Sequence, residues 1–148
     1  MTDSTASPIA SVERELTLRQ SPNRVWRAIT DPDEIAHWFG SSASIDLRPG
    51  GAATFTWEPG HEDGGAYAAR IERVDPPHYL AYRWARDSGV AVDDGPSTLV
   101  EFDLEPTADG GTLLRLRESG FVAEADRAGN DAGWTEELAE LVAYLGAR

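Results

Sequence analysis

The sequence predicts an α+β fold in which a curved antiparallel sheet of about six to seven strands wraps one long C-terminal helix. Most of the middle of the chain alternates apolar and polar residues with the period of a strand, and short links join the later segments. Two helix-start signals follow the first predicted strand, and one apolar helical stripe ends the chain. Because one helix covers only one face of a sheet, we expect the sheet to curve around it.

The N-terminal part of the chain predicts one strand and then two short helices. Residues 9–19 contain an alternating segment and form the first expected strand. Ser21 followed by Pro22 supplies an N-cap and a proline at the first helical position, and Asp31 followed by Pro32 repeats the arrangement. We therefore expect one short helix to begin at each pair.

The middle of the chain predicts the sheet. A turn at Asp109, Gly110 and Gly111 is typical of a hairpin, and longer loops are expected at 59–65 and 86–96. Between the turns and loops lie the alternating segments 43–48, 53–58, 67–71, 80–84, 98–104 and 114–117.

The C-terminal segment predicts the long helix. Its apolar stripe has the spacing i, i+4, i+7 and i+11 and consists of Trp134, Leu138, Leu141 and Leu145. Gly133 weakens a first turn at this point. The helix is therefore expected to begin earlier, between Ala123 and Asp131, or near Asp131 itself.

Length and composition exclude several classes of function. The 148 residues fit one domain, and all 13 basic residues are arginine, against 26 acidic residues and a net charge of −13. Without lysine there is no P-loop lysine and no Schiff-base amine. Without cysteine there are no disulfides, thiolate metal sites or cysteine nucleophiles. The acidic balance argues against nucleic acid and anionic membranes as partners.

The N-terminus predicts a short tail rather than a targeting signal. Residues 1–8 are mostly small and polar, so we expect a disordered tail followed by one domain over 9–148. No signal peptide is expected, and no apolar run reaches the length of a membrane span. The expected location is the cytoplasm.

Few residues point to metal or cofactor chemistry, and we expect neither. His37, His61 and His78 lie far apart and lack helical metal-site spacing. The run His61, Glu62 and Asp63 fits a solvated loop better than a cation site, and His37 fits a surface or packing position better than a pocket mouth. No Gly-Gly pair opens a βαβ unit, and there is no nucleophile elbow.

Taken in order along the chain, a set of short segments resembles the family of activators of the heat-shock protein 90 ATPase, within the START/SRPBCC (helix-grip) superfamily. The segments are 12–14, 21–32, Trp38-Phe39, 47–51, 70–80, Trp84, 110–112, 118–121 and Gly133-Trp134. The resemblance extends from about residue 11 to 146. It implies a single domain with an internal pocket between the sheet and the long helix. It brings no catalytic residue, because the family has no shared catalytic motif to place here.

Aromatic side chains are the most informative candidates for a binding site. Strand alternation and the helix stripe turn many of them inward, where each ring either packs in the core or forms a pocket wall. Trp38 and Phe39 would gate the entrance. The candidate ligand-binding residues are Trp38, Phe39, Phe55, Trp57, Tyr67, Tyr82, Trp84, Phe102, Glu118, Phe121, Trp134 and Leu138.

Glu118 is the polar candidate. It shares a strand face with Leu114 and Leu116, so a regular strand would direct its carboxylate to the pocket or its rim, whereas a bulge would turn it to solvent. Both arrangements fit the sequence.

Three functions fit these observations. The first is a binding protein for a small hydrophobic or aromatic ligand. The second is a protein-interaction module of the co-chaperone type, as the resemblance suggests, and its partner would be a chaperone or a second copy of the chain. The third is an enzyme of cyclase or hydrolase type, which would use Glu118, Tyr67 or Tyr82 as an acid or base.

Overall fold

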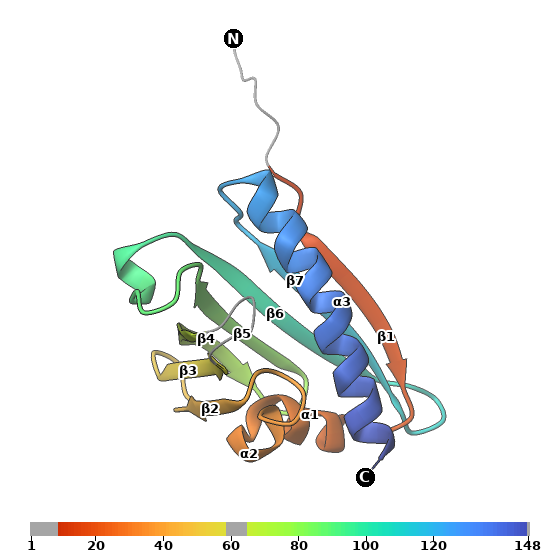
Figure 1. The fold of residues 1–148 in the computed structure, drawn as a ribbon. Coiled ribbons are helices and arrows are strands. Elements are labelled where there is room, and N and C mark those ends of the chain that lie inside the picture. Colours follow the sequence, from red (N-terminus) through yellow and green to blue (C-terminus); the bar gives the residue numbers. More distant parts are fainter. Residues whose placement is uncertain (1–8, 59–64, 148) are drawn as a thin grey trace.

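The computed structural model describes residues 9–58 and 65–147, so the expected tail and the loop around His61 lie outside the described residues. Seven strands form one antiparallel sheet in the order β1-β7-β6-β5-β4-β3-β2 (Figure 1). The strands are β1 (Val12–Leu18), β2 (Ser42–Ile45), β3 (Ala52–Trp57), β4 (Gly65–Asp75), β5 (Tyr79–Ala85), β6 (Ser97–Pro106) and β7 (Thr112–Ser119). The helices are α1 (Pro22–Thr30), α2 (Pro32–Ile35), the 3-10 helix η1 (Val92–Asp94) and α3 (Glu124–Gly146).

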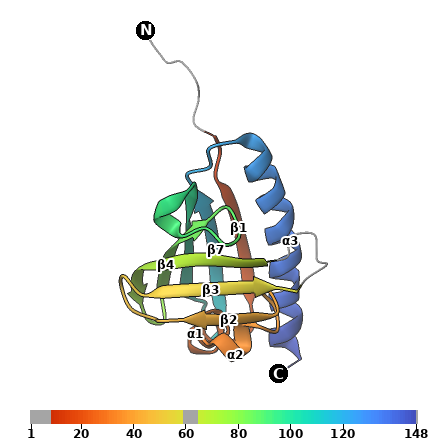
Figure 2. The same ribbon diagram turned by 60° about the vertical axis from the view of Figure 1, so that its left-hand side comes forward.

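The sheet is strongly curved, and α3 lies along its concave side. Figure 2 shows β2, β3 and β4 running across the direction of β1 and β7, with α3 beside them. The register of β4 on β5 shifts between Ile71 and Arg73, and such irregularities increase local bending. The predicted α+β fold with a curved sheet around the last helix is therefore confirmed.

The two predicted helix N-caps, Ser21 and Asp31, are observed in the structure. The Ser21 hydroxyl accepts a hydrogen bond from the Arg24 amide at 3.3 Å, and the Asp31 carboxylate accepts one from the Asp33 amide at 2.9 Å. α3 begins at Glu124, so the earlier of the two predicted starts is correct. The loop predicted over 86–96 contains the short helix η1, which sequence periodicity did not predict.

Glu34 joins the three helices at one end of the sheet. Its carboxylate accepts hydrogen bonds from Arg24 of α1 at 2.6 Å, from Arg27 of α1 at 2.9 Å and from the Tyr144 hydroxyl of α3 at 3.0 Å. Burial disfavours the charged form, but these three donors outweigh it and lower the pKa of Glu34 below its usual value. The short helices are thereby held against the C-terminal half of α3.

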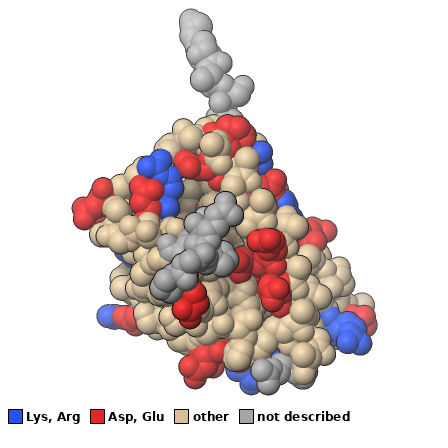
Figure 3. Space-filling view, in the orientation of Figure 1, with Lys and Arg blue, Asp and Glu red and all other residues tan. Residues whose placement is uncertain are grey.

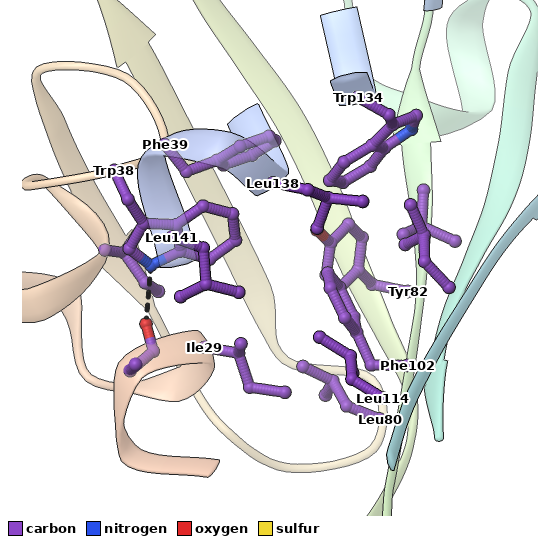
Figure 4. Packing of buried hydrophobic residues seen from close by; sticks show 14 of the residues in the cluster. Ile29, Trp38, Phe39, Leu80, Tyr82, Phe102, Leu114, Trp134, Leu138 and Leu141 are labelled. Atoms are coloured by element: carbon purple, nitrogen blue, oxygen red, sulfur yellow. Dashed lines mark hydrogen bonds between the residues drawn. The ribbon is translucent and has the colours of Figure 1, made fainter. Parts of the chain in front are cut away.

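The core lies between this C-terminal half of α3 and the sheet. Leu138, Leu141 and Leu145 of α3 are all buried, as the apolar stripe predicts. Figure 4 shows the α3 side chains packing toward Leu80, Leu114 and other residues of the strands. Trp38 belongs to this core: it is 4% exposed, and its indole Nε1 donates to the Ala28 carbonyl at 2.8 Å.

Gly40 determines how the segment after α2 meets the sheet. Its φ of +81° is a left-handed conformation, and an added Cβ would lie 2.7 Å from the Thr56 carbonyl oxygen. The next residue, Ser41, donates its amide to the same oxygen at 2.7 Å. This close approach holds Phe39 against β3.

Among the described helices, none combines the length and apolar character needed to cross a membrane.

Candidate functional site

A cavity of about 1120 Å³ lies between the N-terminal half of α3 and the strands β5, β6 and β7. Ligand pockets in proteins usually measure about 300–1,000 Å³, so the space suffices for a small organic molecule. The space-filling view shows a hollow in the upper part of the molecule, with basic and acidic side chains at its rim (Figure 3). The cavity continues the core toward the N-terminal half of α3, where small residues line it.

Besides Phe121, which follows β7, aromatic rings from five different segments form the wall of the cavity. They are Phe39 after α2, Trp57 of β3, Tyr67 of β4, Trp84 of β5 and Trp134 of α3. Strand alternation brings the three strand residues to the concave face, and Gly40 places Phe39 beside them.

These rings hold one another in place. Phe39 stacks on Trp134 with centroids 5.4 Å apart and meets Trp57 edge-on at 5.1 Å. Tyr67 stacks on Trp84 at 5.6 Å. Offset and edge-on contacts of this kind each contribute about 0.5–1.5 kcal/mol beyond burial. The rings of the wall therefore support one another through direct contacts. Trp57, Tyr67 and Trp84 remain only half-buried.

Glu118 is a buried acidic residue of the cavity lining. Only 1% of the residue is exposed. The Thr98 hydroxyl donates to its Oε2 at 2.5 Å, and the Trp134 indole Nε1 donates to its Oε1 at 2.8 Å. The Asn130 amide donates to both oxygens, at 3.1 and 3.0 Å.

The electrostatics of Glu118 follow from these surroundings. Burial is the largest effect and raises the pKa of Glu118 above its usual value, although the donors from Thr98, Trp134 and Asn130 act in the opposite direction. All three donors are neutral. The neighbouring Tyr82, itself buried, has a raised pKa because of its burial and because of the negative charge of Glu118.

The orientation of Glu118 settles the alternative that the sequence left open. Glu118 pairs in register with Val100 of β6 and with Val12 of β1, and β7 is regular at this point. Its side chain therefore lies on the same inner face as Leu114 and Leu116. A bulge that turns the carboxylate to solvent is absent from this strand.

Charged residues surround the mouth of the cavity. The Arg86 guanidinium donates to both carboxylate oxygens of Asp87, each at 3.1 Å, and lies 3.6 Å from Asp126 Oδ2. That Asp126 oxygen is buried and has no hydrogen-bond partner among the described residues, since 3.6 Å is ion-pair distance only. Glu136 and Glu137 of α3 also contribute to the lining.

The structure divides the twelve candidate residues into two groups. The residues that line the cavity are Phe39, Trp57, Tyr67, Trp84, Glu118, Phe121 and Trp134. The others lie in the packed core outside the lining and are Trp38, Phe55, Tyr82, Phe102 and Leu138. Ligand binding by either group remains a prediction.

Several lining residues were missed by the sequence reasoning. The alternating pattern predicts Thr98 only as one residue of a strand face, and no sequence pattern used above points to Asn130. The signal for Asn130 was present, because it lies four residues before Trp134 and so on the same face of α3. The small residues Gly129 and Gly133 share that end of the helix and leave room for the cavity.

The described histidines stand apart from the cavity. His37 stacks on Tyr144 with centroids 5.2 Å apart, and His78 Nδ1 lies 3.3 Å from the Leu104 carbonyl oxygen. Within residues 9–58 and 65–147, no three His, Asp or Glu side chains gather closely enough to hold a metal ion. The loop with His61, Glu62 and Asp63 lies outside the described residues.

Residues 19–146 match the family described as Activator of Hsp90 ATPase homolog 1-like protein. The chain belongs to this family. The match covers strands β2 to β7, both short helices and all of α3, whereas β1 lies just before it, so the residues that line the cavity fall within the family domain. The expected resemblance is thereby confirmed. No curated protein sequence matches the chain.

Solved structures share the fold of this family member over most of its length. Protein MLL2253 from Mesorhizobium loti has a TM-score of 0.78 and 25% identity, covering 93% of this chain and 98% of that one. CalU16 from Micromonospora echinospora has a TM-score of 0.72 and 28% identity, covering 90% and 74%. DynU16, a protein from the dynemicin biosynthetic locus, has a TM-score of 0.75 and 27% identity over 92% of this chain, which spans 47% of DynU16.

Proposed function

We propose that this protein binds a small apolar or aromatic molecule in the cavity between the N-terminal half of α3 and the sheet. The observation that carries the proposal is the composition of the cavity: about 1120 Å³ walled by aromatic rings, with one buried carboxylate at its inner end. Binding sites for small molecules are mostly apolar with a few placed polar groups. The rings bind the body of the ligand, and Glu118 orients it.

The helix sequence supports a space that is kept open. α3 faces the cavity with Ala125, Gly129, Ala132 and Gly133, whereas its second half fills the core with leucines. A Cβ added at Gly129 or Gly133 would meet no heavy atom within 4 Å. Glycine inside a helix costs about 0.5–1 kcal/mol relative to alanine. Gly129 and Gly133 therefore lower the stability of the helix. They also leave space beside α3 that larger side chains would fill in a packed core.

The comparisons support the same proposal more weakly. DynU16 comes from a biosynthetic locus, and both DynU16 and CalU16 share more than a quarter of their aligned residues with this chain. A small molecule as the ligand is in keeping with such a relative.

Protein docking and catalysis have less support. A docking surface for a chaperone or a second copy would need a contiguous apolar patch. The exposed large apolar residues among the described ones, Leu47, Val122 and Val142, come from three separate segments. An enzyme would need a free acid or base. Glu118 is instead engaged by three donors, and Tyr82 is buried outside the cavity lining.

A cavity-filling variant tests the proposal. Gly133→Leu places a side chain in the cavity, and Ala139→Leu adds one on an exposed position of the same helix outside the lining. The neutral fluorescent probe N-phenyl-1-naphthylamine should bind the original protein saturably at one site, bind Ala139→Leu equally well and lose binding to Gly133→Leu. Native mass spectrometry of the purified protein would show any retained molecule. Absence of saturable binding, or equal binding by both variants, would contradict the proposal.

A further inference from the structure

The cavity carries an excess of negative charge at both its inner end and its mouth. Glu118 is buried, and its hydrogen-bond donors Thr98, Asn130 and Trp134 are all neutral. No ion pair to Glu118 is found in the part of the chain that the structure describes. A carboxylate in this position lacks the positive partner that buried charges ordinarily have.

The cationic side chain in the described lining is already engaged. Arg86 pairs with Asp87 and lies 3.6 Å from Asp126, so its charge is balanced within the rim. Glu136 lines the same cavity. Arg86 therefore does not compensate Glu118.

The hydrogen-bond donors nearest to Glu118 are directed to its carboxylate. The Trp134 indole, the Asn130 amide and the Thr98 hydroxyl all donate to Glu118. An anionic ligand would meet the like charge of Glu118 at the inner end of the cavity and of Asp87, Asp126 and Glu136 at its mouth. A neutral ligand would leave the Glu118 charge without a partner.

The aromatic wall favours a cation as well. Trp57, Tyr67 and Trp84 line the cavity and remain only half-buried. The faces of such rings carry negative electrostatic potential and attract ammonium groups, more strongly where water is excluded. Acidic groups and aromatic faces thus act in the same direction.

We propose that this cavity selects organic cations: molecules with an ammonium group on an apolar or aromatic body, in preference to neutral and anionic molecules of the same shape. The ammonium group lies toward Glu118, and the apolar body lies against the rings. This inference rests on the proposed function, because it requires that the cavity bind a small molecule, and it names the chemical class of that molecule.

Three probes of one shape test the selectivity. Benzyltrimethylammonium is cationic, neopentylbenzene is its neutral isostere and phenylmethanesulfonate is an anion of similar size. Tryptophan fluorescence at constant ionic strength measures their affinities, with Trp57, Trp84 and Trp134 as reporters. We expect the cation to bind about tenfold or more tightly than the neutral isostere, the anion to bind more weakly than both, and the cation preference to decrease with added salt.

Charge-removing variants then assign the effect to Glu118. Glu118→Gln should weaken cation binding about tenfold and leave the neutral isostere within about twofold. Glu140→Gln, which removes one exposed charge from α3 outside the lining, is the matched control and should change neither. Glu136→Gln, at an exposed position of the rim, should weaken cation binding by about twofold and provides the test if Glu118→Gln does not fold.

The outcomes separate this inference from the proposed function. Equal affinities for the cation and the neutral isostere, or a cation preference that survives in both Glu118→Gln and Glu136→Gln, overturn the selectivity while ligand binding stands. If none of the three probes binds and N-phenyl-1-naphthylamine also fails, both the selectivity and the proposed function are wrong.

Discussion

Trp134 donates its indole Nε1 hydrogen to Glu118 Oε1 at 2.8 Å, and this hydrogen bond joins α3 to β7 at the inner end of the cavity. The ring of the same tryptophan stacks on Phe39 at 5.4 Å. One side chain therefore links the buried carboxylate, the aromatic wall and the segment after α2. The polar and apolar halves of the site depend on each other through this residue.

Replacing Trp134 by phenylalanine should separate these two roles. The variant keeps a ring that can stack on Phe39 but removes one donor to buried Glu118. We expect the free energy of unfolding to fall by about 1–3 kcal/mol, because a buried charged acceptor loses a partner. Urea denaturation measures the change. Trp38→Phe is the control, because it also removes a buried indole donor, the one to the Ala28 carbonyl. It should likewise lower the free energy of unfolding but leave probe binding unchanged.

Threonine-to-valine substitutions test the second donor. Thr98→Val removes the hydroxyl that donates to Glu118 at 2.5 Å, and Thr112→Val removes a buried hydroxyl that donates to the Gln20 carbonyl at 2.8 Å. Both should lower the free energy of unfolding by about 1–2 kcal/mol. Only Thr98→Val should alter ligand affinity, because Thr112 does not line the cavity. Equal effects of the two variants on affinity would show that Thr98 does not act through Glu118.

The pH dependence of stability should distinguish Glu118 from Glu34. The pKa of Glu118 is raised above the ordinary 4.5. The stability advantage of the original protein over Glu118→Gln should therefore be largest below pH 4.5. This advantage should shrink as the pH rises through the pKa of Glu118 in the folded state. The pKa of Glu34 is lowered below 4.5. The stability advantage of the original protein over Glu34→Gln should therefore be fully present above pH 4.5. It should disappear as the pH falls through the pKa of Glu34 in the folded state.

Thermal or urea unfolding of the three proteins over a pH series measures both differences. The two difference curves should slope in opposite directions. Parallel curves would contradict the opposite pKa shifts of the two carboxylates.

Sequence periodicity predicted which face each strand turns inward but not how deep each residue lies. Phe55 and Trp57 lie on the same face of β3, as alternation requires. Phe55 is 2% exposed and belongs to the packed core, whereas Trp57, at the end of the strand, lines the cavity. Whether a residue reaches the cavity or the packed core depends on the curvature of the whole sheet. No local sequence pattern predicts that curvature.

Trp38 and Phe39 show a second reason. Both were expected to gate the cavity, but the α-helix α2 ends at Ile35, and the turn that follows has no helical phase from which to predict direction. The structure directs Trp38 to the Ala28 carbonyl and Phe39 to the cavity. Asn130, in contrast, was predictable in principle, because its spacing from Trp134 places both on one face of α3.

Helix glycines provide the last prediction, which tests whether the space beside α3 is maintained at the expense of stability. Gly129→Ala and Gly133→Ala should each raise the free energy of unfolding by about 0.5–1 kcal/mol, because alanine favours the helix and its Cβ meets no atom within 4 Å. Gly40→Ala is the contrasting control and should destabilise, since its φ is +81° and its Cβ would lie 2.7 Å from a backbone oxygen. Urea denaturation measures all three. A loss of stability in the helix variants would mean that the glycines are needed for packing rather than for an open cavity.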